Sequence, residues 1–184
     1  MACQNVKFIK TVKYFDDRGY FLETWNKKQL LTEGIDVDFV QDNQSFSSKA
    51  GTIRGLHAQA PPFAQSKLVW CTRGRILDIA VDIRHGSPNF GSWLGKEISE
   101  DNGIQVFIPE GFLHGFVTLE ENTEVAYKCS RFYSPSHEIT IRFDDPQIGI
   151  KWPCLETEII LSKKDRSGIP LRALESPFIF GEID

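Results

Sequence analysis

The sequence lacks the features expected of a membrane protein, a secreted protein or a nucleic-acid-binding protein. It contains no apolar run of about eighteen residues, so no helical membrane span is expected. The N-terminus, M-A-C-Q-N-V-K-F, has no apolar signal-peptide core. A formal net charge of -4 provides no general basic surface for nucleic acid. We therefore expect a cytoplasmic protein whose partner is a small molecule.

Cysteine is scarce, and its spacing suggests neither disulfides nor a metal site. The four cysteines form no C-x-x-C pair, which predicts free thiols in a reducing compartment. Cys71 and Cys129 lie in apolar segments and are expected to be small buried residues. No internal repeat, low-complexity tract or linker divides the 184 residues. With 41% hydrophobic and 25% charged residues, the chain is expected to form one soluble domain over residues 1–184.

Short extended segments separated by turn signals dominate the sequence. The turn Asp101-Asn102-Gly103 predicts a hairpin, and another is expected across Phe15 to Gly19. Helices are expected only at Lys27 to Glu33, after Asn26, and from Ser162, where a capping box begins. This pattern predicts an all-β sandwich or barrel. The expected strands are Val6 to Tyr14, Tyr20 to Trp25, Asp36 to Ser45, Lys67 to Cys71, Ile76 to Ile83, Ser92 to Ser99, Ile104 to Ile108, Val117 to Leu119, Glu124 to Cys129 and Glu138 to Phe143.

The stretch from Gly51 to Val69 has the highest concentration of polar side chains. It reads as two short strands joined by a proline-rich bend, with five donors or acceptors: Arg54, His57, Gln59, Gln65 and Lys67. A histidine near a lysine is a plausible proton-transfer site, because imidazole titrates near neutral pH and a cation can stabilise a developing oxyanion. A hydrogen-bonded structural histidine and a solvated lysine remain alternatives.

Successive side chains on a strand point to opposite faces, so the pattern of alternation decides which of these side chains lie together. Simple alternation places His57 and Gln59 on one face and Arg54 on the other. A bulge at Gly55 would shift that phase.

The segment Ile76 to Ile83 alternates regularly, with Asp78 and Asp82 on one face. If this face lines a barrel, the two acids mark a ligand cavity. If it faces solvent, they are simply hydrated. His85, in the following loop, is expected at the surface.

Several motifs together give a specific family resemblance. From about Phe15 to Pro170 the chain resembles the dTDP-4-dehydrorhamnose 3,5-epimerase family. The motifs are R-G-L-H at 54–57, A-Q-S-K-L-V at 64–69, D-I-A-V-D-I-R at 78–84, I-P-E-G-F-L-H-G-F at 108–116, Y-K-C at 127–129 and L-S-K-K-D at 161–165. The resemblance implies a cupin jelly roll, a homodimer that exchanges N-terminal strands, and a nucleotide-diphosphate 4-keto-6-deoxy sugar substrate in deoxysugar biosynthesis.

The resemblance also implies the catalytic groups. A 4-keto group acidifies the C–H bonds at C3 and C5, so inversion needs a base, an acid on the other face and an electrophile for the enolate oxygen. The resemblance makes His57 the base, Asp165 its partner, Lys67 the electrophile and Tyr127 the acid. Asp165 could instead cap a helix, and Tyr127 could be a core residue. No cofactor is expected.

Substrate-binding residues are likewise implied by the resemblance. Arg54 would grip the diphosphate, because arginine makes paired charge-assisted hydrogen bonds. His114, with Asp78 as its partner, would lie at the same pocket, and Gln41 and Asn43 would help to hold the sugar nucleotide. Tyr133 would stack near the base. The D-x-R-G-x-F-x-E match at 16–23 would carry three residues into the partner's site, namely Arg18, Phe21 and Glu23. Surface roles remain alternatives for Gln41, Asn43, Arg18 and Tyr133.

Two departures bear on the chemistry. Ala58 replaces the aromatic residue that usually follows the family's motif histidine, which affects packing or pocket shape more than proton transfer. Metal-binding cupins use an H-x-H pair, whereas this motif reads His57-Ala58-Gln59, so no metal site is expected.

Three classes of function remain open. The first is an epimerase acting at C3, C5 or both, with single-carbon enzymes on CDP-, GDP- or dTDP-linked sugars or heptoses as the nearest alternative. The second is a 3,4-ketoisomerase of the same fold. The third is a sugar-binding cupin without catalysis, which the presence of all four catalytic residue types disfavours.

Overall fold

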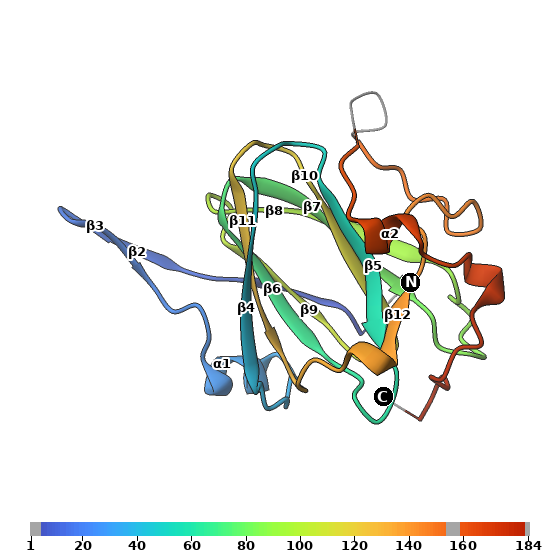
Figure 1. The fold of residues 1–184 in the computed structure, drawn as a ribbon. Coiled ribbons are helices and arrows are strands. Elements are labelled where there is room, and N and C mark those ends of the chain that lie inside the picture. The colour runs from blue at the N-terminus through green and yellow to red at the C-terminus, as the bar shows by residue number, and fades with distance from the viewer. Residues whose placement is uncertain (1–4, 154–158, 183–184) are drawn as a thin grey trace.

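Two antiparallel sheets face each other in the computed structural model, which describes residues 5–153 and 159–182 (Figure 1). Together they form the all-β fold that the sequence pattern predicted, in the jelly-roll arrangement that the family resemblance implied. In spatial order the first sheet contains β1 (Lys7–Lys10), β9 (Ile104–Ile108), β6 (Lys67–Arg73), β11 (Thr123–Cys129) and β4 (Gln41–Ser47). The second contains β12 (Glu138–Thr140), β5 (Ile53–Gln59), β10 (Phe112–Thr118), β7 (Arg75–Asp82) and β8 (Trp93–Ser99).

Helices are few and short, as the sequence predicted. Helix α1 (Lys27–Thr32) begins after Asn26, whose side chain accepts a hydrogen bond from Lys28 N. Helix α2 (Lys163–Arg166) begins after Ser162, whose hydroxyl accepts from Asp165 N. Two 3₁₀ turns, η1 (Pro135–His137) and η2 (Leu171–Ala173), complete the helices found in residues 5–153 and 159–182. None of the described helices is long and apolar enough to cross a membrane.

Apolar side chains pack in three layers. The middle layer, between the sheets, includes Val69, Ile76 and Val125. An outer layer on the second sheet includes Leu56, Ile79 and Trp152, where residues 141–153 and 159–182 cover β5, β7 and β10 (Figure 1). The third layer lies where Leu30 of α1 packs on the first sheet. Because β7 is covered on both faces, Ile76 to Ile83 shows the predicted alternation with neither face in solvent.

Part of the N-terminal strand prediction was wrong. Val6 to Tyr14 is not one strand. β1 pairs with β9 in the barrel, whereas β2 (Lys13–Asp16) pairs with β3 (Gly19–Leu22). The chain changes partner at Thr11, whose backbone N–H donates to Gly103 O.

Other boundaries also differ from the prediction, and the strand expected over Tyr20 to Trp25 ends at Leu22. Strand β10 runs unbroken from Phe112, so His114 lies on a strand. The segment Asp36 to Ser45 is regular only from Gln41, and the strand predicted to reach Phe143 ends at Thr140.

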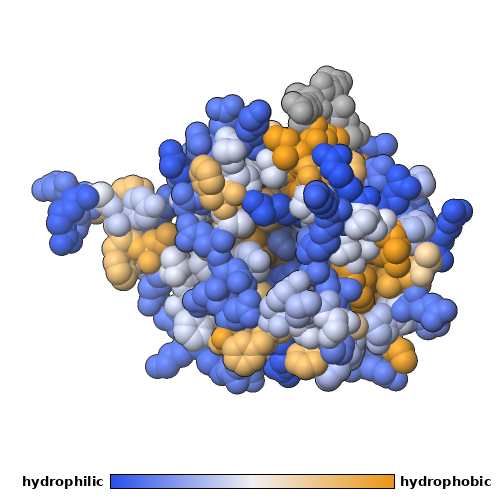
Figure 2. All heavy atoms as spheres, in the orientation of Figure 1, coloured by the Kyte–Doolittle hydropathy of each residue, from blue (hydrophilic) through white to orange (hydrophobic). Residues whose placement is uncertain are grey.

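The β2–β3 hairpin projects away from the barrel (Figure 1). Its side chains include exposed aromatic residues, among them Phe15 and Phe21, which are 75% and 69% exposed. Figure 2 shows this arm, at the left, with hydrophobic side chains on its surface. A two-stranded ribbon is at best marginally stable alone, so this arm needs a further surface to pack against.

Candidate active site

A cavity of about 550 Å³ opens between the two sheets. In Figure 2 the surface is hollowed near the middle of the view, over the space between β4 and β5. Strands of both sheets and helix α2 contribute to its lining. The lining residues are Gln41, Asn43, Ser45, Arg54, His57, Ala58, Gln59, Gln65, Lys67, His114, Phe116, Tyr127, Cys129, Tyr133, Glu138, Ser162, Lys164 and Asp165.

A bulge at Gly55 brings Arg54 and His57 to the same cavity. In the register with β10, His57 lies opposite His114 and Arg54 opposite Phe116, so β5 has one residue more than its partner. Gly55 has a φ of +123°, and a Cβ there would lie 2.6 Å from the Gly115 Cα. Only glycine fits this conformation and this approach. Of the two phases that the sequence left open, the bulged one is therefore correct.

His57 is held by a carboxylate that lies 108 positions further along the chain. Its Nε2 lies 2.5 Å from Asp165 Oδ1, and the Asp165 side chain is only 4% exposed. The other Asp165 oxygen accepts from Ser162 Oγ at 2.8 Å, and the Asp165 backbone N–H donates to the same hydroxyl. Asp165 thus forms part of the helix N-terminus and contacts His57 at once, so the two expected roles coexist.

The electrostatics of this pair favour a neutral histidine beside an ionised acid. Burial lowers the pKa of His57 below its ordinary value of 6.5, outweighing the hydrogen bond to Asp165 that raises it. Burial raises the pKa of Asp165, but hydrogen bonds from His57 and Ser162 lower it by more, leaving it below its ordinary value. A neutral imidazole that donates Nε2–H to Asp165 has its lone pair on Nδ1. This is the form that can accept a proton from a ligand.

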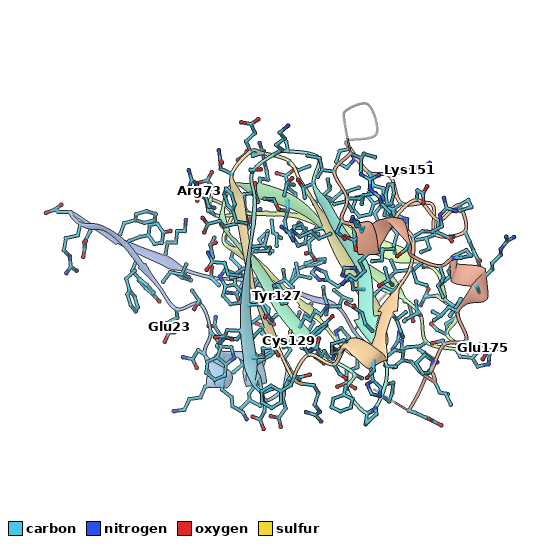
Figure 3. The ribbon with its side chains drawn as sticks, viewed as in Figure 1. Glu23, Arg73, Tyr127, Cys129, Lys151 and Glu175 are labelled. Carbon is cyan, nitrogen blue, oxygen red and sulfur yellow. The ribbon has the colours of Figure 1, made fainter. Side chains whose placement is uncertain are left out.

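The opposite sheet contributes Tyr127 and Lys67. Tyr127 on β11 lies between Asn43 of β4 and Val69 of β6, and Lys67 lies beside Cys129. Figure 3 shows Tyr127 and Cys129 on the same strand, near the middle of the molecule. Within the described part of the chain, neither the Tyr127 hydroxyl nor the Lys67 ammonium has a hydrogen-bond partner or an ion pair. Both groups are therefore available to a ligand.

Burial shifts the pKa values of these two groups in opposite directions. It lowers the pKa of Lys67 below 10.5, partly opposed by the nearby Cys129, Asp78 and Glu138. It raises the pKa of Tyr127 above 10.0. Tyr127 is thus a phenol, able to give a proton, throughout the physiological pH range.

The two acids of β7 have different surroundings, and neither is solvated. Asp78 Oδ2 lies 2.7 Å from His114 Nε2, so the expected His114–Asp78 pair is confirmed as a contact. Asp78 contacts the lining residue His114 but does not itself line the cavity, and neither does Asp82. Asp82 accepts from Arg84 Nη2 at 2.8 Å and from Ser87 Oγ at 2.8 Å in a buried structural cluster. His85 lies at the surface, as expected.

The expected binding residues Gln41, Asn43, Arg54 and Tyr133 all line the cavity. Gln41 Nε2 donates to Asn43 Oδ1 at 3.0 Å, and Gln41 Oε1 accepts from the Tyr133 backbone N–H at 3.0 Å. Arg54 donates to Phe46 O at 2.8 Å and to Ser47 Oγ at 3.2 Å, which orients its guanidinium.

Three other expected residues lie away from this cavity. Arg18 is at the tip of the projecting hairpin and pairs with Asp16, and Phe21 is exposed on β3. Glu23 lies at the root of the hairpin, well to one side of Tyr127 (Figure 3).

Sequence reasoning missed an ion pair at the cavity mouth. Lys164 Nζ lies 2.7 Å from Glu138 Oε1, and the Tyr133 hydroxyl donates to Glu138 Oε2 at 3.2 Å. All three residues line the cavity. The only available signal for Lys164 was its place beside Asp165 in the L-S-K-K-D motif. Among the described residues, no group of three His, Cys, Asp or Glu side chains is arranged to hold a metal ion.

The fold and this cavity define a cupin-type protein with acid–base side chains facing each other, and comparisons with known proteins identify the family. The family model described as dTDP-4-dehydrorhamnose 3,5-epimerase matches residues 1–173. A protein of that name from Sinorhizobium fredii is 45% identical over 183 residues, covering 100% of this chain and 93% of the relative.

Two crystal structures extend the comparison to three dimensions. The dTDP-4-dehydrorhamnose 3,5-epimerase of Bacillus anthracis, solved with TDP and PPi bound, superposes with a TM-score of 0.87 at 45% identity, covering 90% of this chain and 94% of that one. The dTDP-6-deoxy-D-glucose-3,5-epimerase of Legionella pneumophila, in complex with dTDP-4-keto-L-rhamnose, gives 0.89 at 42% identity, covering 95% and 93%. The chain belongs to the dTDP-4-dehydrorhamnose 3,5-epimerase family, and it is an isomerase.

Proposed function

We propose that this protein inverts both C3 and C5 of a dTDP-linked 4-keto-6-deoxy sugar by proton transfer across the cavity. The observation that carries the proposal is the placement of His57, with Asp165, on one sheet and of Tyr127 and Lys67 on the other. Inversion requires a proton to leave one face of the sugar ring and another to arrive on the opposite face. A base and an acid on facing sheets supply that geometry.

His57 Nδ1 takes the proton from C5 or C3 in the first step. The C–H electron pair moves into the ring to form the enolate, whose negative charge lies on the C4 oxygen. Asp165 stabilises the resulting imidazolium through the Nε2 hydrogen bond. Because the pKa of His57 is lowered, the base remains neutral and competent at physiological pH.

Lys67 stabilises the enolate. Its ammonium lies in the cavity without an ion-pair partner among the described residues, so it is available to form a direct ion pair with an oxyanion. Tyr127 then gives its phenolic proton to the same carbon from the other face, and the C4 carbonyl re-forms. Proton exchange with water through the open mouth returns His57 and Tyr127 to their starting states, and the second carbon follows.

The diphosphate and the nucleobase are held by other parts of the cavity. Arg54 is oriented by Phe46 O and Ser47 Oγ, and its remaining N–H donors are offered to the diphosphate. His114, backed by Asp78, lies next to His57 on the neighbouring strand. Tyr133 at the mouth offers a ring for the base. We further propose a homodimer in which the β2–β3 hairpin brings Arg18, Phe21 and Glu23 to the partner's cavity.

The test is direct incubation of the purified protein with dTDP-, CDP- and GDP-linked 4-keto-6-deoxy sugars in deuterium oxide. NMR then reads which carbons exchange and invert. Deuterium at both C3 and C5 with inversion at each, and preference for the dTDP sugar, supports the proposal. Inversion at one carbon only would assign a single-carbon epimerase, and migration of the carbonyl from C4 to C3 would assign a ketoisomerase.

A further inference from the structure

The short loop around Tyr133 is held at the cavity mouth by a buried side-chain amide. Gln59 Nε2 donates to Phe132 O at 3.3 Å and to Phe63 O at 2.7 Å, and Gln59 Oε1 accepts from Ser134 N at 2.7 Å. Gln59 therefore bonds the backbone immediately before and immediately after Tyr133.

Gln59 is well placed to fix this loop. Its side chain is only 4% exposed, and it lies two residues beyond His57 on β5, which is paired on both sides by β10 and β12. Both amide N–H groups and the amide oxygen are used, so the side chain has little freedom to reorient. These hydrogen bonds thus fix the loop that carries Tyr133 relative to β5, the strand that carries His57.

A second amide approaches the same loop from the other sheet. Gln41 Oε1 accepts from the Tyr133 N–H, so three consecutive backbone residues, 132 to 134, are bonded by glutamine side chains of β5 and β4. The Tyr133 ring itself is weakly restrained. It is 52% exposed, and within the described ranges its hydroxyl makes a single hydrogen bond, to Glu138. The placement of the ring therefore depends on the backbone.

We propose that Gln59 is a positioning residue that sets Tyr133 for the nucleobase of the substrate, and so determines affinity for the nucleotide rather than the rate of proton transfer. This inference rests on the proposed function. It predicts that changing Gln59 weakens the binding of a ligand that carries a nucleobase. The binding of a ligand without a nucleobase should be unaffected.

The experiment compares thymidine diphosphate with inorganic pyrophosphate as probes, by calorimetry on the intact protein. Gln59→Met keeps the side-chain length and removes all three hydrogen bonds. We expect Kd for thymidine diphosphate to rise on the order of tenfold, with Kd for pyrophosphate changed less than about twofold. The KM for the nucleotide sugar should rise in parallel while kcat stays near the wild-type value. Gln44→Met, at an exposed position on β4 outside the cavity, is the matched control and should change neither affinity.

A double-variant cycle separates this role from general damage to the fold. In a Tyr133→Ala background, Gln59→Met should raise Kd for thymidine diphosphate by less than about twofold, because the ring that it positions is gone. The inference would be overturned if Gln59→Met weakened the binding of both probes equally. It would also be overturned if Gln59→Met raised Kd for thymidine diphosphate by the same factor in the Tyr133→Ala background as in the wild-type protein. If Gln59→Met does not fold, Gln59→Glu takes its place, since it keeps the acceptor but turns oxygen towards the two carbonyls. Failure of the wild-type protein to bind thymidine diphosphate would refute the proposed function instead.

Discussion

Replacing Asp165 by asparagine should slow proton abstraction while leaving the architecture of the site in place. An asparagine can still accept from His57 Nε2–H and can donate to Ser162 Oγ, so both side-chain contacts of Asp165 have a neutral substitute. What disappears is the negative charge that stabilises the imidazolium formed when His57 takes a proton.

The magnitude follows from the hydrogen bond. A bond to a charged group contributes about 1.5–3 kcal/mol, and a neutral one contributes about 1 kcal/mol. The difference, roughly 0.5–2 kcal/mol, corresponds to a loss of about 2- to 30-fold in kcat. The carboxyl is only 4% exposed, which places the expected loss towards the upper end, because charge interactions are weakly screened there. KM should change little.

The pH dependence of kcat/KM gives a second test of Asp165, because the direction in which it should shift can be worked out. The hydrogen bond and charge of Asp165 raise the pKa of His57 against the lowering effect of burial. Removing the charge should lower that pKa further, so the acid limb of kcat/KM should move to lower pH even as the maximum rate falls. Ser162→Ala, which keeps the carboxylate, is the control and should leave the limb near its wild-type position. An Asp165→Asn enzyme with wild-type kcat and an unmoved acid limb would refute the role given to this pair.

Three other predictions follow from the same site and fold. The acid limb of wild-type kcat/KM should lie below pH 6.5, because His57 must be neutral and burial lowers its pKa. The alkaline limb should lie below pH 10.5, because Lys67 must keep its proton and burial lowers its pKa; stopped assays across pH check both limbs, and an alkaline limb above 10.5 would exclude Lys67 as the required cation. Sedimentation should show a dimer at assay concentration, and Arg18→Ala should raise KM; a fully active monomer would contradict the hairpin exchange. Gly55→Ala should lower the free energy of unfolding by about 2 kcal/mol or more, measured by urea unfolding, because the added Cβ would lie 2.6 Å from Gly115 Cα and the residue has a positive φ. Unchanged stability would show that β5 can adopt a different register.

The sequence revealed the family and most of the cavity, because the relevant residues lie in short motifs. It did not establish how those motifs meet. Asp165 is 108 positions from His57, and no local pattern links them except the capping box, which correctly predicted the turn that orients the acid. The bulge at Gly55 was an open alternative because it depends on the close approach of Gly115, a residue on another strand.

Other parts could not be predicted from local patterns at all. Glu138 and Lys164 look like ordinary solvated charges in sequence, and only the fold brings them together at the mouth. The break at Thr11 was missed because the apolar pattern continues through it, whereas the pairing partner changes from the barrel to the hairpin. Asp82 shares its strand face with Asp78, yet the Arg84 and Ser87 bonds hold it in a structural cluster.

The most direct test of the central claim, a base and an acid on opposite sheets, is to measure deuterium incorporation and inversion separately in a Tyr127→Phe enzyme. This substitution removes only the phenolic hydroxyl, so His57 should still exchange the C5 or C3 proton with solvent and return it to the same face, while inverted product falls by about 10²–10⁴-fold. His57→Asn should abolish exchange and inversion together. Inversion by Tyr127→Phe at the wild-type rate, or continued exchange by His57→Asn, would contradict the account.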